Sequence, residues 1–210
     1  MQVGILGTGM YLPSRIVSNH ELSTTLETTN EWIVEKLGIR QRHIAAPEQA
    51  TSDLAVEAAR RALDDANTRA SELDLIIVAT STPDMLQPPT AAFVQARLES
   101  PGAAAFDVAA VCAGFVYAIS VAASMLAFNS RWKRALVIGA DTYSRILDWK
   151  DRKTCVIFGD GAGAVVLGQV EPGLGIVATT LGSDGTKAAL VRYPGGGSRF
   201  PASQATITKN

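Results

Sequence analysis

The segment Phe106-Asp-Val-Ala-Ala-Val-Cys112-Ala-Gly-Phe is the most informative stretch of the sequence, because it predicts a strand that turns directly into a helix. Residues 103–108 form a short apolar strand, and a turn of small residues then leads into a helix that runs to Phe128. Cys112 stands at the start of this helix, where free N–H groups and the helix dipole stabilise a thiolate. The two small residues after it would let a substrate approach the sulfur closely. Cys112 is therefore either an exposed nucleophile or a buried structural cysteine, and the spacing alone leaves both open.

The helix after Cys112 is apolar enough to require a check for a membrane span. Residues 108–128 carry no charge, and a stretch of this length could cross a bilayer. Ten of these residues are Ala, Gly or Ser, which contribute little transfer free energy. A helix that is apolar all round is also what the centre of a large soluble core requires. We therefore expect a buried helix and no membrane association.

Strands and helices alternate on both sides of this segment. Before it, the pattern predicts a strand at 3–8, two short helices opened by capping boxes at Ser18 and Thr28, a helix at 52–66, a strand at 75–79 and a helix at 90–98. After it, strands are predicted at 135–140, 155–158, 164–167 and 175–180, with a glycine-rich turn between the second and third. The alternation predicts an α/β fold with a mostly parallel sheet and helices on both faces.

The composition excludes several classes of protein. With 47% hydrophobic and 19% charged residues among 210, the chain is too apolar to be disordered. Its 19 basic and 20 acidic side chains leave no positive excess for nucleic-acid phosphates. Only two cysteines occur, and the N-terminus lacks the basic and small-residue features of a signal peptide. These features indicate a reducing, cytoplasmic location.

Two cysteine- and glycine-containing motifs have both a structural and a chemical interpretation. Cys155 lies in a predicted strand without small neighbours, and we expect it to belong to the core. No C-x-x-C pair accompanies it, so a metal site is not expected. The motif Phe158-Gly-Asp-Gly-Ala-Gly could cradle a phosphate or form a tight turn between strands.

The histidines and one tryptophan are further candidates. His20 is expected to be solvated, and His43 to make a structural hydrogen bond. Neither is marked by the pattern as a base for Cys112. Trp32, with Lys36 one helical turn later, could offer a ring and a cation to an anionic nucleotide. The alternative for this pair is an ordinary amphipathic helix.

Five motifs, spread in order along the chain, together resemble the ketoacyl-acyl carrier protein synthase III family of the thiolase superfamily. They are Gly7-Thr-Gly-Met-Tyr-Leu-Pro13, Thr28-x-x-Glu-Trp32-Ile, Gly38-Ile-Arg-Gln-Arg-His43-Ile-Ala-Ala, Phe106-Asp-Val-Ala-Ala-Val-Cys112-Ala-Gly-Phe and Phe158-Gly-Asp-Gly-Ala-Gly-Ala. The resemblance implies a thiolase-like layered αβαβα fold, of which residues 1–182 would supply the N-terminal half with the nucleophile. Residues 183–210 would be a loop connecting to a C-terminal half.

The resemblance also implies an activity. In that family a cysteine takes an acyl group, typically acetyl, from coenzyme A. It then condenses this group with malonyl-acyl carrier protein after decarboxylation, which initiates fatty acid biosynthesis. Cys112 would be the catalytic nucleophile of such an acyltransferase. The implied partners are acyl-CoA as substrate, acyl carrier protein and a second copy in a homodimer, with no permanently bound cofactor.

Binding residues follow from the same resemblance. Trp32 would stack on the adenine of coenzyme A with Thr28 beside it, and Arg152 would hold the ring from the other side. Lys36 stands where the family often has Arg, so a phosphate contact there would be a point charge. Phe158 would line the acyl pocket. Two residues of the Met85–Pro88 stretch, Leu86 and Gln87, would reach the pocket of the partner subunit.

One departure from the family pattern concerns residues that are not found. The catalytic histidine and asparagine of the family lie in its second half, and neither appears before Asn210. The chain is therefore expected to be the front portion of a longer enzyme and not to complete the condensation alone. Three alternatives remain: a non-catalytic partner subunit of a condensing complex, a condensing enzyme of specialised metabolism, and an actin-like nucleotide-binding domain suggested by Gly-Asp-Gly.

Overall fold

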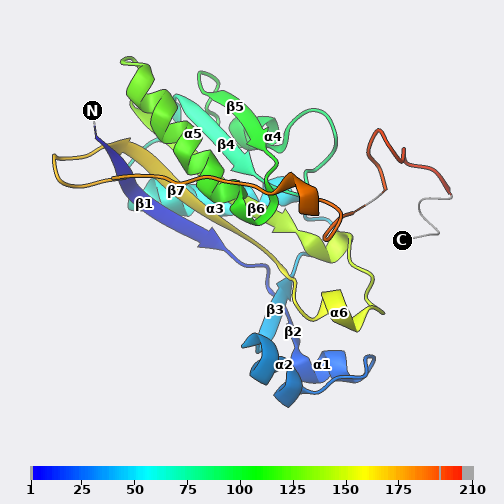
Figure 1. The fold of residues 1–210 in the computed structure, drawn as a ribbon. Helices are drawn as coiled ribbons and strands as arrows, with labels where there is room; N and C mark the ends of the chain where they lie inside the picture. Colours follow the sequence, from blue (N-terminus) through cyan, green and yellow to red (C-terminus); the bar gives the residue numbers. More distant parts are fainter. Residues whose placement is uncertain (1, 194, 205–210) are drawn as a thin grey trace.

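The computed structural model of the protein describes residues 2–193 and 195–204. In chain order the strands and α-helices are β1 (Val3–Tyr11), β2 (Arg15–Ser18), α1 (Asn19–Ser23), α2 (Asn30–Leu37), β3 (Gln41–Ile44), α3 (Thr51–Asp65), β4 (Leu75–Ala79), α4 (Thr90–Arg97), β5 (Ala104–Val108), α5 (Gly114–Phe128), β6 (Arg134–Thr142), α6 (Arg152–Cys155) and β7 (Asp160–Gln169). Short 3-10 turns occur at η1 (Ala70–Glu72), η2 (Val111–Ala113), η3 (Tyr143–Arg145) and η4 (Gly185–Lys187). Figure 1 shows two regions: a twisted sheet with its helices, and below it a small lobe made of β2, α1, α2 and β3.

The main sheet has five strands in the order β1-β7-β6-β4-β5. β4 runs parallel to β5 and to β6, whereas β7 runs antiparallel to β6 and to β1. The prediction of a mostly parallel sheet is therefore wrong, because two of the four strand pairings are antiparallel. The reason lies in the excursion between β6 and β7: the chain returns to the end of the sheet it left, with Asp160 paired to Thr142, so β7 must run back along β6.

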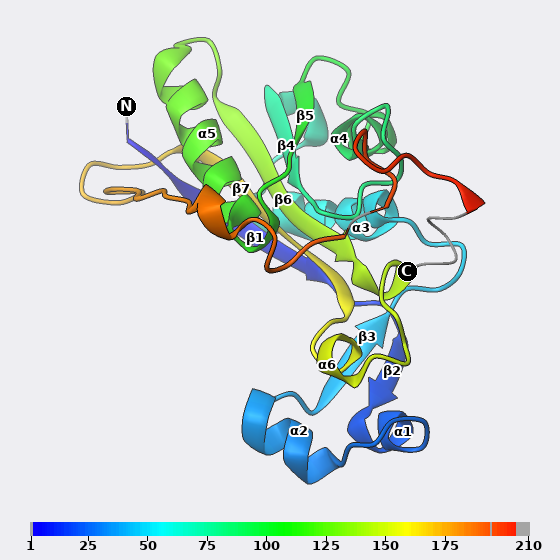
Figure 2. The ribbon, with the colours of Figure 1, turned by 45° about the vertical axis from the view of Figure 1, so that its right-hand side comes forward.

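Helices cover both faces of this sheet, as predicted. Figure 2 shows α5 on one side and α3 with α4 on the other. All of β4 is buried, and its side chains alternate between two cores: Ile76 and Val78 pack with α3, and Leu75 and Ile77 pack with α5. A strand covered on both faces reads as a continuous apolar run, which is why β4 was predictable.

Helix α5 is buried along one face rather than all round. Ala118, Ala122 and Leu126, one turn apart, are fully buried against the sheet, whereas Val116 is 50% and Phe128 94% exposed. The expectation of a completely buried helix is therefore wrong for this chain. By length and composition alone, Val111–Phe128 is also the one segment among the described residues that could span a membrane.

Two predicted strands are absent from the described part of the chain. Residues 155–158 are not a strand: Asp151 caps the short helix α6, its carboxylate accepting from Lys153 N, and local capping overrides the β propensity of the residues that follow. Residues 175–180 form no ladder either. Ile176 N donates to Val3 O, but Gly175 has a φ of +108° that breaks the extended backbone beside β1.

Helix α2 begins one residue later than its predicted capping box. Thr29, and not Thr28, is the N-cap, its hydroxyl accepting from Trp32 N at 3.1 Å. The predicted stop is confirmed, since Gly38 adopts a left-handed φ of 72° directly after Leu37. The boundary expected at residue 182 stays a prediction.

Candidate active site

Cys112 lies on the turn η2, between the end of β5 and the first residue of α5, and its side chain is exposed. Val111, directly before it, has a φ of 48°, a left-handed conformation that a β-branched residue rarely adopts. Gly114 lets α5 begin close to β4, since a Cβ there would lie 3.3 Å from the Cβ of Ala79. A buried structural cysteine is therefore excluded. The strained turn presents the sulfur outward, and such strain concentrates at functional sites.

Cys155 is the opposite case. Its side chain is fully buried in the small-lobe core with Ile33, Ile44 and Val156. Burial raises the pKa of the Cys155 thiol. The predicted core role is confirmed, although the residue ends helix α6 rather than lying in a strand.

Trp32 and Arg152 are brought together from positions 120 residues apart in the chain. The guanidinium carbon of Arg152, at the start of α6, lies 4.7 Å from the ring centroid of Trp32 on α2. Arg152 also donates to the carbonyl of Glu27 at 2.6 Å. This contact is a cation–π interaction. An adenine held between the two groups needs about 3.5 Å on each of its faces, so Arg152 has to move away from the ring before a nucleotide base enters.

Thr28 and Lys36 flank this pair. The hydroxyl of Thr28 is buried and has no hydrogen-bond partner. A buried hydroxyl without a hydrogen-bond partner costs about 1–3 kcal/mol. A ligand group that hydrogen-bonds to the Thr28 hydroxyl would therefore recover part of this free energy on binding. Lys36 is exposed, and its ammonium lies 2.7 Å from the carboxylate of the neighbouring Glu35.

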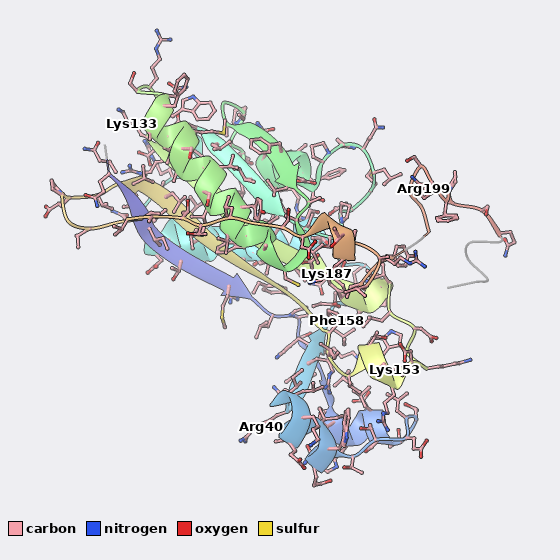
Figure 3. All side chains as sticks on the ribbon, viewed as in Figure 1. Arg40, Lys133, Lys153, Phe158, Lys187 and Arg199 are labelled. Atoms are coloured by element: carbon pink, nitrogen blue, oxygen red, sulfur yellow. The ribbon has the colours of Figure 1, made fainter. Side chains whose placement is uncertain are left out.

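The two parts of the predicted acyl site lie in different places. Phe158 is stacked on the ring of Tyr143, with centroids 4.6 Å apart, and lies where the sheet meets the small lobe (Figure 3). Leu86 is 82% exposed on the loop between β4 and α4, and Gln87 follows it before a cis peptide bond to Pro88. Leu86 also lines a cavity of about 750 Å³ that extends to Tyr193.

The Gly-Asp-Gly motif has a structural role. Asp160 is buried; its carboxylate accepts from Ala45 N at 2.7 Å and from the amide and hydroxyl of Ser144. A Cβ on Gly159 would lie 2.9 Å from the Cβ of Arg42, so glycine is required by a close approach of two backbones. These glycines belong to the start of β7 and the segment before it, and no turn between strands or phosphate cradle is formed.

The histidines behave as predicted. His20 is exposed on α1, and Nδ1 of His43 is hydrogen-bonded to the carbonyl of Pro13. Within residues 2–193 and 195–204, no group of three His, Cys, Asp or Glu side chains is arranged to hold a metal ion.

Half-buried carboxylates at the loop that carries Leu86 were missed by the sequence analysis. Asp141, at the end of β6, accepts from Ser81 N at 2.8 Å and from the hydroxyl of Thr82 at 3.0 Å. Burial raises the pKa of Asp141 against these hydrogen bonds, which lower it. Asp107 on β5 similarly accepts from two amides at the start of α4. A lone aspartate at the end of an apolar strand is the only sequence signal for either residue.

Comparisons with known proteins agree with the motifs. Residues 106–185 match the family model of 3-oxoacyl-[acyl-carrier-protein (ACP)] synthase III. The beta-ketoacyl-[acyl-carrier-protein] synthase III of Caldanaerobacter subterraneus subsp. tengcongensis is 53% identical over 207 residues, covering 99% of this chain and 62% of the relative. The protein of the same name from Desulfitobacterium hafniense is 50% identical over 209 residues, covering 100% of this chain and 63% of the relative.

A solved structure shows the same arrangement of elements. The 3-oxoacyl-(acyl carrier protein) synthase III of Pseudomonas aeruginosa PAO1 superposes with a TM-score of 0.88 at 40% identity, over 98% of this chain and 62% of that one. Fold and exposed cysteine together define a thiolase-like protein. Within that class the chain is similar to the N-terminal portion of the 3-oxoacyl-[acyl-carrier-protein] synthase III proteins. It spans about 62% of the length of the curated relatives.

Proposed function

We propose that this chain is the nucleophile-bearing portion of a beta-ketoacyl-acyl carrier protein synthase III. The enzyme would condense an acyl-CoA primer, acetyl-CoA first, with malonyl-acyl carrier protein at the start of fatty acid biosynthesis. The observation that carries the proposal is the exposed Cys112 on a strained strand-to-helix turn, inside the segment that matches the family model. A non-catalytic partner subunit would not need this nucleophile.

In the first half-reaction, the thiolate of Cys112 attacks the carbonyl carbon of the acyl-CoA thioester. A carbon–sulfur bond to Cys112 forms, the bond to coenzyme A breaks, and coenzyme A leaves as a thiolate that takes up a proton. Amides of the first turn of α5, which begins two residues after Cys112, would supply the hydrogen-bond donors for the developing oxyanion.

The nucleotide end of coenzyme A would bind at the small lobe. Trp32 offers a ring face to the adenine, and Arg152 swings from its contact with Trp32 to cover the other face. The hydroxyl of Thr28, which has no partner, would gain a hydrogen bond to the bound nucleotide. The ammonium of Lys36 would leave the carboxylate of Glu35 and contact a phosphate of coenzyme A. Coenzyme A is a substrate here, and we propose no permanently bound cofactor.

In the second half-reaction, malonyl-acyl carrier protein loses CO₂, which leaves a carbanion on its thioester. This carbanion attacks the carbonyl carbon of the acyl group on Cys112. A carbon–carbon bond forms, the carbon–sulfur bond to Cys112 breaks, and Cys112 is released as a thiolate. Decarboxylation requires hydrogen-bond donors aimed at the enolate oxygen. His20 is exposed on α1 and His43 is committed to Pro13, so neither serves. We propose that a histidine and an asparagine from a further part of the enzyme supply these donors.

The acyl pocket and the assembly complete the proposal. Phe158 would line the pocket, and the exposed Leu86 with Gln87 would reach the pocket of a second copy in a homodimer and limit primer length. We propose a cytoplasmic location for this enzyme.

The test is a two-stage assay of the natively expressed protein. Incubation with acetyl-CoA alone should place one acetyl group on Cys112, located by peptide mass spectrometry. Addition of malonyl-acyl carrier protein should then release CO₂ and form acetoacetyl-acyl carrier protein. Absence of acetylation at Cys112, together with absence of product, would contradict the proposal.

A further inference from the structure

Arg42 is a buried cation that no functional assignment uses. It lies on β3, is 4% exposed, and has only neutral hydrogen-bond acceptors in the described structure. Its Nη1 donates to the carbonyl of Val17 at 3.1 Å, and its Nη2 donates to Asn19 Oδ1 at 2.9 Å and to the carbonyl of Val156 at 3.1 Å. Its Nε is buried without a partner. A single nitrogen of Arg42 thus connects the start of α1 with the end of α6.

Asn19 carries this connection to helix α2. Its side chain is fully buried, and its amide nitrogen donates to the carbonyl of Ile39 at 2.7 Å and to Asn30 Oδ1 at 3.2 Å. Asn30 is the first residue of α2, and Ile39 lies just beyond the glycine that ends it. One amide group therefore holds both ends of the helix that carries Trp32.

Apolar packing alone fixes α2 weakly. Ile33 is its only buried residue, and α6 has one turn and one buried residue, Cys155. A helix attached by one apolar side chain can rotate and slide, whereas directional bonds at both ends set its register. The relative position of Trp32 and Arg152 therefore depends on the bonds that run from Val156 through Arg42 and Asn19.

The energetics argue for positioning rather than stability. Removing a guanidinium from water is costly, and burial lowers the pKa of Arg42. Hydrogen bonds to neutral acceptors offset less of this desolvation free energy than a bond to a carboxylate would. Buried ionic groups also often add little to the net stability of the fold. Arg is suited to the task because its planar fork reaches several acceptors in fixed directions, which a lysine ammonium does not.

We propose that Arg42, acting through Asn19 and Val156, is a positioning residue that sets the separation of Trp32 and Arg152 for binding the adenine of coenzyme A. This inference rests on the proposed function. Arg42 touches neither substrate nor Cys112; it holds the two elements that grip the nucleotide.

The experiment measures the Kd of coenzyme A by calorimetry on the natively expressed protein and its variants. Arg42→Lys should raise the Kd about tenfold, and Asn19→Ala, which keeps the bonds of Arg42 to Val17 and Val156, should raise it by a similar factor. The matched control is Arg40→Lys, two residues away: Arg40 is exposed on the outer side of the small lobe (Figure 3) and should leave the Kd unchanged. The rate of alkylation of Cys112 by iodoacetamide should stay within about twofold in all variants.

A double-mutant cycle separates positioning from general destabilisation. In a Trp32→Ala background, Arg42→Lys should have a much smaller effect on the Kd, because the separation of Trp32 and Arg152 that Arg42 sets no longer matters once the ring is gone. Full additivity in this cycle, an unchanged Kd in both Arg42→Lys and Asn19→Ala, or a parallel loss of Cys112 alkylation would overturn the inference. Absence of coenzyme A binding by the unsubstituted protein would contradict the proposed function itself, and the inference with it.

Discussion

The sheet and the small lobe hold their candidate functional residues by different means. Cys112 follows β5 and precedes α5, whose inner face packs on strands that are buried on both sides. Trp32 lies on a helix with one buried side chain, and buried polar groups hold both ends of that helix. Apolar packing is collective and tolerates small losses, whereas each directional bond sets one position. Cys112, the proposed nucleophile, should therefore be insensitive to changes in the small lobe, and the proposed nucleotide recognition should be sensitive to them.

The largest expected effect is at the nucleophile. Cys112→Ala should abolish acetylation and lower condensation by at least about 10³-fold, since no other exposed thiol occurs among the described residues. The measurement is intact mass after incubation with acetyl-CoA. The control is Cys155→Ala. This variant should still be acetylated at Cys112, because the thiol that it removes is buried in the small-lobe core. Acetylation that survives in Cys112→Ala would move the nucleophile elsewhere.

The packing of the sheet region is tested by two glycines on neighbouring strands. Gly9→Ala should lower the free energy of unfolding by about 3 kcal/mol, because its Cβ would lie 2.3 Å from the backbone oxygen of Ala58 on α3. Gly163→Ala should change it by less than about 1 kcal/mol, because nothing lies within 4 Å of a Cβ there. Urea unfolding measures both, and equal effects would contradict the close approach of β1 to α3.

A smaller, pH-dependent effect is expected at Asp141, between the sheet and the Leu86 loop. Burial raises its folded-state pKa above the unfolded value of 3.8, so the folded state keeps its proton longer and stability falls as pH rises from 3.8 to the folded pKa. Asp141→Asn removes this dependence. The unfolding free energy of the unsubstituted protein, minus that of the variant, should therefore decrease over this window in urea titrations.

A control for Asp141 should slope in the opposite direction. Hydrogen bonds from Thr186 hold the pKa of the exposed Asp184 below 3.8, so its contribution is present above that value and is lost as pH falls. The same difference measured for Asp184→Asn should rise with pH. A rising difference for Asp141→Asn would mean that its hydrogen bonds outweigh its burial.

The smallest effect is expected from an ion pair on the surface of α3. Arg60 contacts Glu57 at 2.9 Å, one turn away, and both side chains are exposed. Arg60→Ala should change the unfolding free energy by about 0.5 kcal/mol or less, because water screens the pair. A loss above about 1.5 kcal/mol would show that exposed charges contribute to the sheet region as strongly as packing does.

The sequence predicted the sheet region better than the small lobe and its surroundings, for a physical reason. β4 and α3 were predictable because burial produces apolar periodicity in them. The same pattern placed Cys112 at a strand-to-helix turn but left open whether it is a nucleophile or a structural cysteine. The helical state of Cys155 follows from the local cap by Asp151, which the strand prediction overlooked. The reversal of β7 depends on its pairing with β6 and β1, and Arg42 donates to the carbonyl of Val156, 114 residues away. No local pattern encodes such contacts. The Trp32–Arg152 pairing came only from the family resemblance.

The most direct test compares two acetyl donors in Trp32→Ala. The account predicts that acetylation of Cys112 by acetyl-CoA slows about tenfold, as expected for the loss of one base-stacking contact, while acetylation by acetyl-N-acetylcysteamine, which has no nucleotide, is unchanged. Trp149→Ala is the matched control, since Trp149 and Trp32 are both 36% exposed, and it should leave both rates unchanged. Equal slowing with both donors in Trp32→Ala would show that the small lobe shapes the nucleophile itself, and would contradict the separation of chemistry from recognition.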